Sequence, residues 1–316
     1  MGEICLVIWE TVLCHDILYV SMAYLTEEKE TVLRKQANDI RISIVEMLKE
    51  AKSGHTAGPL GMADVFTALY FHIAHHDPQN PEMDNRDRII LSNGHIVPVR
   101  YATMAHAGYF PIEELMTLRK LGSRLQGHPE RTRLPGLENT SGPLGSGLSQ
   151  SAGIAYAARM DGKKFRTFCL MSDGELNAGN TWEGAMFAGK NKLSNLTAII
   201  DRNNIQINGM TEDVMPLEPL ADKWESFGWH VMEIDGHNME EIVDACEKAR
   251  AIVEKPTVII ARTIPGKGIP EIEFDYRWHG APPGKGPGDI PKEEQSAVFL
   301  KRLRTLGGEI EAGHSE

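Results

Sequence analysis

An acidic residue and an amide residue, each placed just after an apolar segment, are the first feature of the sequence that could do chemistry. Asp173 and Gly174 follow the apolar residues 168–172, and Asn203 follows the apolar residues 196–201. A separation of about 30 residues is that of one strand–helix–strand unit. A carboxylate and an amide oxygen suit a hard cation such as Mg²⁺, and a glycine lets a diphosphate approach the backbone closely. Together they indicate a metal-anchored diphosphate site, whereas either feature alone is typical of an ordinary turn or loop.

Short apolar segments that alternate with helical segments must position these residues. Strands are predicted at residues 88–92, 168–172, 196–201, 229–234 and 256–262. Helices are predicted from Thr26 to about residue 53 and at residues 62–74, 100–107, 112–121 and 181–193, with another before each of the last two strands. This alternation predicts an α/β fold, a parallel sheet with helices on both faces. Ligands of such sheets bind beyond the carboxyl ends of the strands, where Asp173 and Asn203 are expected.

The composition narrows the class of protein. The 316 residues are 41% hydrophobic and 24% charged, which is ordinary for a globular enzyme. A formal net charge of −11 argues against nucleic acid or an anionic membrane as the main partner, but leaves a sugar phosphate open. The four cysteines form no CxxC pair and no cluster with histidine, so we expect neither disulfides nor zinc. A reduced, cytoplasmic protein is the expectation that follows.

The N-terminal segment needs a separate interpretation. Residues 5–24 are largely apolar, but Glu10, His15 and Asp16 interrupt them and no basic segment precedes them. This pattern argues against a signal peptide or a membrane span. We therefore expect the natural start at Met22, an atypical extension at residues 1–21, one large domain at residues 22–290 and a C-terminal helical tail at residues 291–316.

The sequence around Asp173 resembles a known cofactor motif. Residues 172–175 read Ser-Asp-Gly-Glu, and Asn203 is followed two positions later by Ile205. This pattern is similar to the motif by which enzymes hold thiamine diphosphate and Mg²⁺. The resemblance implies that Asp173, Asn203 and the backbone carbonyl of Ile205 ligate the metal. It also implies that Gly174 and Asn203 contact the cofactor.

A longer series of segments resembles the N-terminal half of transketolases, in the same order and over residues 53–281. These segments lie at residues 53–55, 85–88, 91–95, 122–124, 127–130, 141–147, 255–257, 266–268 and 279–281. The resemblance implies that residues 22–290 form a thiamine-diphosphate-binding domain. The implied reaction is transfer of a two-carbon ketol unit from a ketose or its phosphate to an aldose or its phosphate.

The resemblance also assigns roles to residues whose types alone decide little. A lone histidine is most often a surface or satisfied core residue. Of the 12 here, His55, His95, His128 and His279 each stand beside a glycine. The implied catalytic residues, near the reactive carbon or the sugar, are His55, His128 and His279. The residues implied to line the cofactor pocket are His95, Gly142, Pro143, Leu144, Ile207 and again His279. Leu144 and Ile207 could equally be ordinary core residues.

Some parts of the transketolase pattern are absent or altered. Transketolases carry the glutamate that activates the aminopyrimidine in a second half, which lies outside this sequence. The resemblance therefore implies a separate C-terminal subunit, with two copies of each chain in the assembly. Ser172 replaces the first glycine of the motif, and Thr56-Ala57 replace Pro-Gly. Ala178 stands where the family has a glutamate, which puts a carboxylate contact between paired sites in doubt, although Glu183 is retained.

Two kinds of alternative stay open at this stage. One is a related thiamine-diphosphate enzyme, either a 2-oxo acid dehydrogenase subunit or a deoxyxylulose-phosphate synthase. The segments at residues 92–95, 127–130 and 279–281 favour transketolase over both. The other is a cofactor-binding scaffold without activity, against which the retained histidines argue.

Overall fold

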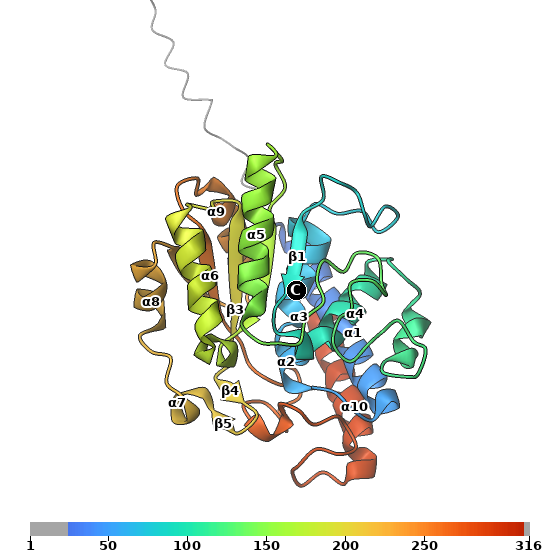
Figure 1. Ribbon diagram of the computed structural model, residues 1–316. Coiled ribbons are helices and arrows are strands. Elements are labelled where there is room, and N and C mark those ends of the chain that lie inside the picture. The colour runs from blue at the N-terminus through green and yellow to red at the C-terminus, as the bar shows by residue number, and fades with distance from the viewer. Residues whose placement is uncertain (1–24, 313–316) are drawn as a thin grey trace, which may run out of the picture.

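The computed structural model describes residues 25–312, and its path is shown in Figure 1. The predicted start at Met22 and the extension at residues 1–21 lie outside these residues, as do residues 313–316. Within residues 25–312, none of the helices combines the length and the apolar character that crossing a bilayer requires.

A five-stranded parallel sheet forms the centre of the fold, with strand order β1-β2-β3-β7-β6. Its strands are β1 (Arg88–Leu91), β2 (Thr167–Ser172), β3 (Leu196–Arg202), β6 (His230–Asp235) and β7 (Thr257–Arg262). β2 and β3 are buried along their whole length, as strands covered on both faces must be. All the predicted strands are present, which confirms the α/β class.

Helices cover both faces of this sheet. Alternate strand residues point to opposite faces, so each strand contributes side chains to a core on either side. Phe168 and Leu170 of β2 pack into one hydrophobic core, while Cys169 and Met171 pack into a second core. The main helices are α1 (Glu27–Ala51), α2 (Ala57–Gly61), α3 (Ala63–Ala68), α4 (Val97–His106), α5 (Ser146–Met160), α6 (Gly179–Lys190), α7 (Thr211–Val214), α8 (Leu220–Ser226), α9 (Met239–Ala251) and α10 (Lys292–Ala312). Figure 1 shows α5 and α6 side by side in the left half of the view, and α1 and α10 on the right.

Helix α1 begins where the sequence predicts. The side chain of Thr26 accepts a hydrogen bond from the backbone N–H of Lys29 at 3.2 Å, and acidic residues fill the first turn. This arrangement satisfies a free backbone donor and complements the positive end of the helix dipole. The helix ends at Ala51, followed by Lys52 in the left-handed conformation (φ 54°).

Four local features differ from the sequence predictions. The helix predicted at residues 62–74 is α3 followed by a π-helical turn, Leu69–Ile73. The helix predicted at 112–121 is only a 3₁₀ turn, Ile112–Thr117, because Leu118 is extended and Arg119 takes a positive φ of 61°. Helix α5 was not predicted, since its many glycines, alanines and serines give weak apolar periodicity. The hairpin β4 (Ile205–Gln206) and β5 (Gly209–Met210) was also missed.

The C-terminal helix predicted from about residue 291 is α10, and it packs against α1. Phe299 and Leu303 are fully buried, and Phe299 meets Trp278 edge to face with ring centroids 5.2 Å apart. Asn38 of α1 donates a hydrogen bond from Nδ2 to the carbonyl of Leu303 at 2.9 Å. The helical tail is therefore part of the main hydrophobic core.

Candidate functional site

The site begins at the carboxyl ends of β2 and β3. These strands are parallel neighbours, and Ser172 at the end of β2 stands opposite Asp201 of β3. Asp173 directly follows β2, and Asn203 follows Asp201 by two residues. Both therefore lie at the same edge of the sheet. The prediction that Asp173 and Asn203 follow adjacent strands is confirmed.

Asp173 is fully buried and its carboxylate is held from several directions. Oδ1 accepts the backbone N–H of Gly174 at 2.7 Å, and Oδ2 accepts the backbone N–H of Asn204 at 2.7 Å. Nη1 of Arg202 donates to Oδ2 at 3.0 Å. Burial raises the pKa of the Asp173 carboxyl, and the Arg202 charge opposes that rise.

The amide of Asn203 is oriented by a buried carboxylate. Its Nδ2 donates to Oδ2 of Asp201 at 2.6 Å, and Thr263 Oγ1 donates to Oδ1 of the same carboxylate. The amide oxygen of Asn203 accepts only the nearby backbone N–H of Ile205, at 3.1 Å. With its NH₂ committed to Asp201, Asn203 offers its oxygen as the group able to reach a ligand.

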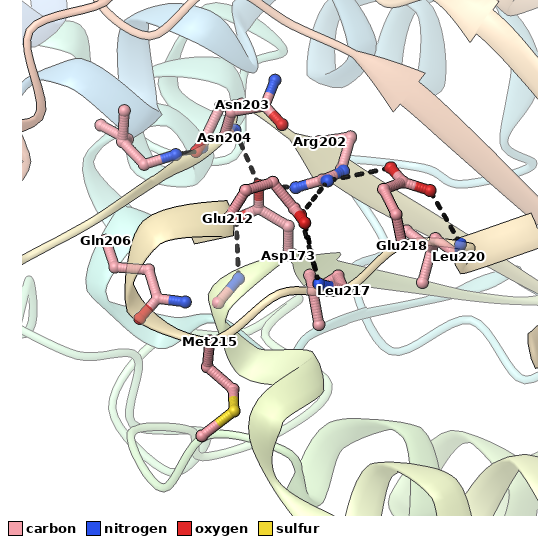
Figure 2. Close-up of polar contacts among 12 residues, drawn as sticks. Asp173, Arg202, Asn203, Asn204, Gln206, Glu212, Met215, Leu217, Glu218 and Leu220 are labelled. Atoms are coloured by element: carbon pink, nitrogen blue, oxygen red, sulfur yellow. Dashed lines mark hydrogen bonds and ion pairs between the residues drawn. The ribbon is translucent and has the colours of Figure 1, made fainter. Parts of the chain in front are cut away.

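Arg202 is a site residue that sequence reasoning missed. Figure 2 shows its guanidinium between Asp173 and two glutamates from the segment after β5. Nη2 donates to Glu212 at 2.6 Å and to Glu218 at 3.0 Å. Arg202 therefore links Asp173 to the segment 211–220. The acidic partners lie 10 and 16 residues away in sequence, a spacing that predicts no contact.

Glu175 was predicted only as part of the motif, yet it joins three segments of the site. Its Oε1 accepts the hydroxyl of Ser92 and the backbone N–H of Gly145, the latter at 2.6 Å. Its Oε2 accepts the backbone N–H of Ser172 at 3.2 Å. Burial raises the pKa of this carboxyl. An acidic residue directly after an Asp-Gly turn was the one signal that could have pointed to it.

A cavity of about 320 Å³ opens above these strand ends. Its lining residues are His55, His95, His128, Gly142, Leu144, Ser172, Gly174, Glu175, Asn203, Ile205, Gln206, Ile207 and His279. Most of the residues predicted for the site therefore meet here, although they come from distant parts of the chain. Two predicted residues do not line the cavity. Asp173 is buried, and Pro143 is exposed beside the lining residues Gly142 and Leu144.

Three of the histidines form one cluster. The ring centroids of His55 and His95 are 4.9 Å apart, those of His55 and His279 are 5.4 Å apart, and those of His95 and His279 are 5.0 Å apart. Burial lowers the pKa of His55 to about 3, helped by the charges of His279 and Arg119. Burial also lowers the pKa of His95 and of His279. The cluster is therefore neutral at pH 7 and offers both donor and acceptor nitrogens.

Several buried polar atoms near the cavity lack a partner, as expected where a polar ligand belongs. Within residues 25–312 these include Nδ1 of His55 and of His279, both side-chain polar atoms of Asn93 and the hydroxyl of Ser141. Gly94 fits closely beneath this region, because an added Cβ would lie 2.4 Å from the Ser141 oxygen. The cavity can therefore take a ligand rich in hydrogen-bonding groups.

The oxygen atoms at the strand ends fit a hard cation. Asp173 supplies a carboxylate, Asn203 an amide oxygen and Ile205 a backbone carbonyl, which is the ligand chemistry of Mg²⁺. The described part of the chain has no group of three or more His, Cys, Asp or Glu side chains suited to a metal.

The match to a family model decides what this arrangement represents. The model described as "Transketolase, thiamine diphosphate binding domain" matches residues 32–295. The chain belongs to this transketolase family. It is a thiamine-diphosphate-dependent transferase subunit with the fold that the sequence predicts, and the 2-oxo acid dehydrogenase and deoxyxylulose-phosphate synthase alternatives are set aside.

Two groups of relatives, shorter transketolase subunits and longer transketolases, support this assignment. The chain is 45% identical to the 6-deoxy-6-sulfo-D-fructose transketolase subunit SqwG of Clostridium sp. (strain MSTE9), over 76% of this chain and 88% of that protein. It is 42% identical to an apulose-4-phosphate transketolase subunit of Phocaeicola vulgatus, over 79% of this chain and 89% of that protein. Human transketolase is 38% identical over 81% of this chain, but only 41% of that protein is covered.

Solved structures give the same result. Transketolase from Campylobacter jejuni superposes with a TM-score of 0.75 at 32% identity, covering 89% of this chain and 48% of that chain. Transketolase from Leishmania mexicana superposes with the same TM-score over 90% of this chain and 46% of that chain. The chain thus spans nearly the length of the transketolase subunits above and less than half the length of the longer transketolases.

Proposed function

We propose that this chain binds thiamine diphosphate through a divalent cation and transfers a two-carbon ketol unit together with a separate C-terminal subunit. The observation that carries this proposal is the convergence of oxygen donors and neutral histidines on one cavity. Asn203 and the histidine cluster line this cavity, and Asp173 is buried at the adjacent strand end. The substrates proposed are a ketose phosphate as donor and an aldose phosphate as acceptor.

Each group of residues has a distinct task in this proposal. Asp173, Asn203 and the carbonyl of Ile205 hold Mg²⁺, and Gly174 lies against the diphosphate. Thiamine diphosphate, when bound there, would supply the electron sink that cleavage of a carbon–carbon bond requires. His55 and His279 accept or donate protons at the sugar oxygens, which their low pKa values allow because the rings are neutral. His128, on the cavity wall, orients the sugar.

The remaining predicted contacts concern binding of the cofactor ring system. His95 and His279 contact it in this proposal, and Gly142, Pro143 and Leu144 border it. Ile207 packs against it with a side chain that is 66% exposed in the described chain.

A partner subunit completes the proposed enzyme. SqwG and the P. vulgatus protein are named as subunits, and this chain spans nearly nine-tenths of each. We propose two copies of this chain and two of the partner, which static light scattering of the purified complex would measure. The acidic charge and unclustered cysteines favour a cytoplasmic location.

Calorimetry of cofactor binding tests the proposal directly. Thiamine diphosphate should bind the wild-type chain, with its partner present, only when Mg²⁺ is added. Asp173→Ala should abolish this binding, because a buried carboxylate ligand is lost. Asp222→Ala, an exposed residue of α8, is the matched control and should bind normally. Equal binding by wild type and Asp173→Ala would refute the proposed anchor.

Transfer activity separates an enzyme from a cofactor-binding scaffold. The complex of this chain and its partner is mixed with fructose 6-phosphate as donor and glyceraldehyde 3-phosphate as acceptor. Formation of a five-carbon ketose phosphate and erythrose 4-phosphate supports the enzyme. Tight cofactor binding without transfer to any of a panel of aldoses would support the scaffold instead.

A further inference from the structure

A largely buried histidine lies behind the candidate active site and joins two segments that lead to it. His237 follows the end of β6 at Asp235, and its side chain is 9% exposed. The ring does not line the cavity of the histidine cluster. It is therefore placed to influence the reaction only through other residues.

Both ring nitrogens of His237 make short hydrogen bonds. Nε2 accepts the backbone N–H of Ile264 at 2.7 Å, so this nitrogen carries no proton. Nδ1 lies 2.7 Å from Oδ2 of Asp64, and it carries the ring proton that is donated to this carboxylate. The two bonds select one neutral tautomer. The ring thus connects α3, which contains Asp64, to the chain that follows β7.

The carboxylate of Asp64 is itself held in place by Arg41 of α1. Nη2 of Arg41 forms an ion pair with Oδ2 of Asp64, and Nε donates to the backbone carbonyl of Leu60 at 3.0 Å. Burial acts to raise the pKa of Asp64, but the Arg41 charge and the His237 hydrogen bond outweigh it and lower the pKa to about 2. Asp64 is therefore an ionised and well-anchored acceptor for the His237 ring.

One of the two connected segments carries His55. This residue lies just before α2, and α2 leads directly into α3. Arg41 holds the carbonyl of Leu60 in α2, and Asp64 lies in the first turn of α3. The turn that carries His55 is therefore anchored to α1 through the same arginine that holds Asp64.

The other segment, residues 263–281, follows β7 and carries His279. Two hydrogen bonds join it to the segment of His55. The backbone N–H of Gly266 donates to the carbonyl of Ala57 at 2.9 Å, and the hydroxyl of Thr56 donates to the carbonyl of Ala281 at 2.6 Å. The two segments therefore meet on either side of the histidine cluster.

Ile264 is the point at which His237 acts on this contact. An added Cβ at Gly61 would lie 2.9 Å from the carbonyl oxygen of Ile264, so the two backbones touch. Nε2 of His237 is the acceptor for the Ile264 N–H, and an N–H left without an acceptor in so tight a contact costs free energy. His237 therefore holds the segment of His279 against the segment of His55.

We propose that His237 is a positioning residue, whose ring sets the distance between His55 and His279 by fixing Ile264. The ring centroids of these two histidines are 5.4 Å apart. The inference rests on the proposed function, in which both rings exchange protons with the sugar. Such transfer requires donor and acceptor within hydrogen-bond reach, so a small displacement of one segment slows it. The proposed metal ligands follow β2 and β3, and their geometry should not depend on His237.

Two variants of His237 separate its two hydrogen bonds. His237→Gln keeps an acceptor at the reach of Nε2, whereas His237→Asn keeps a polar group only at the reach of Nδ1. In transfer assays of the complex with its partner, we expect His237→Asn to lower kcat about tenfold, because the bond to Ile264 is lost. The KM for fructose 6-phosphate and the Kd for thiamine diphosphate should stay unchanged. His237→Gln should keep kcat within about twofold of the wild type, because Ile264 retains an acceptor.

His106→Asn is the matched control for a general loss of stability. His106 of α4 is a partly buried histidine whose ring also makes two hydrogen bonds, with Ser43 at 2.9 Å and Gln36 at 3.0 Å. It does not line the cavity of the histidine cluster. Urea unfolding should show a loss of stability similar to that of His237→Asn, while kcat should match the wild type.

NMR of the full chain alone tests the positioning without any transfer assay. His237→Asn should shift the ring-proton signals of His55 and His279, whereas His237→Gln and His106→Asn should leave them in place. The two signals are assigned by their loss in His55→Asn and in His279→Asn. This measurement needs neither cofactor nor partner, so it distinguishes failure of the positioning from failure of the proposed reaction.

Two results would overturn the role of His237. One is a wild-type kcat in His237→Asn together with unmoved ring signals, which would show that the bond to Ile264 does not position the cluster. The other is an equal loss of kcat in His237→Asn and His106→Asn, which would trace the effect to stability alone. Ring signals that move as expected in a complex without transfer activity would support the positioning and refute the proposed function.

Discussion

At the scale of single residues, the environment of the histidine cluster decides its chemistry. The rings of His55, His95 and His279 are buried against one another, so a proton on one ring disfavours a proton on the others. Burial contributes most to the lowered pKa of each of the three rings. Neutral imidazoles in a confined space can exchange protons with sugar oxygens at neutral pH.

Acid should therefore destabilise the chain in the absence of cofactor. The pKa of His55 is lowered from 6.5 to about 3, so the unfolded chain binds a proton that the folded chain does not bind between these values. Stability contributed by the neutral ring is present above pH 6.5 and is lost as the pH falls toward 3. From pH 7 to pH 5 the unfolding free energy should fall by about 2 kcal/mol more in wild type than in His55→Asn.

Urea unfolding at the two pH values measures this difference. The comparison uses the full chain without thiamine diphosphate, so that ligand binding does not contribute. Parallel loss of stability in wild type and variant would show that His55 takes up its proton in the folded state as well.

The residues that the sequence predicts for the site belong to short motifs, and the structure brings most of them to one cavity. Short segments of recognisable type led to the prediction of Asp173, Asn203, His55, His95, His128 and His279. Arg202 and Glu175 were missed because their roles depend on partners that only folding brings near. The type of a buried charged residue carries no information about its partner.

At the scale of elements, Arg202 links the segment 211–220 to the end of β3 through its ion pairs. Its side chain is 2% exposed and its partner Asp173 is 1% exposed. Removing one partner of a buried ion pair leaves an uncompensated charge. Arg202→Gln should therefore lower the unfolding free energy by about 3 kcal/mol, measured by chemical denaturation.

The control for this variant is another arginine at the end of a strand. Arg262 of β7 pairs with Glu233, but their side chains are 57% and 41% exposed. Arg262→Gln should change stability by less than about 1 kcal/mol, because exposed ion pairs contribute little. Similar losses in both variants would contradict the buried link between Arg202 and Asp173.

Helix α10 provides a second test at this scale. Phe299 has no exposed surface and packs against Trp278, so Phe299→Ala should cost about 3–5 kcal/mol through lost burial and a residual cavity. Lys301→Ala, on the exposed side of the same helix, should be nearly neutral. Thermal unfolding of both variants measures the contrast, and a neutral Phe299→Ala would mean that the tail is not needed for the core.

Elements were predictable where apolar residues follow a clear period. β2 and β7 contain continuous apolar runs, and every strand of the central sheet was placed within about two residues, the usual uncertainty of an element's ends. Helix α5 failed this test because small residues fill its sequence and burial depends on close packing with α6. The helix predicted at residues 112–121 is longer than the observed 3₁₀ turn, Ile112–Thr117, because local periodicity does not reveal the positive φ at Arg119.

At the scale of the whole molecule, two cores share one sheet and should unfold together. Cys246 of α9 lies in one core, and Cys169 of β2 points into the other. Both thiols are fully buried, and burial raises the pKa of Cys246 to about 12 and raises that of Cys169 further still. A buried, protonated thiol is inert to thiol reagents.

Thiol labelling can therefore show whether the two cores unfold cooperatively. A Cys5→Ser/Cys14→Ser variant leaves only these two cysteines, and neither should react with a disulfide reagent in native buffer. Both should become reactive over the same range of urea concentration if the cores unfold as one unit. Labelling of one cysteine at clearly lower urea would instead reveal two separate folding units.

The three-way junction at Glu175 has a consequence for the life of the protein in a cell. Because its carboxylate joins segments at residues 92, 145 and 172, we expect the cofactor pocket to form only when these segments have folded together. Thiamine diphosphate would then bind the folded chain and not the unfolded chain, which protects the protein from unfolding and proteolysis. The gain in unfolding free energy grows with the logarithm of the cofactor concentration. The abundance of this subunit is thereby tied to the vitamin supply of its host, and thiamine starvation should lower the amount of the protein as well as its activity.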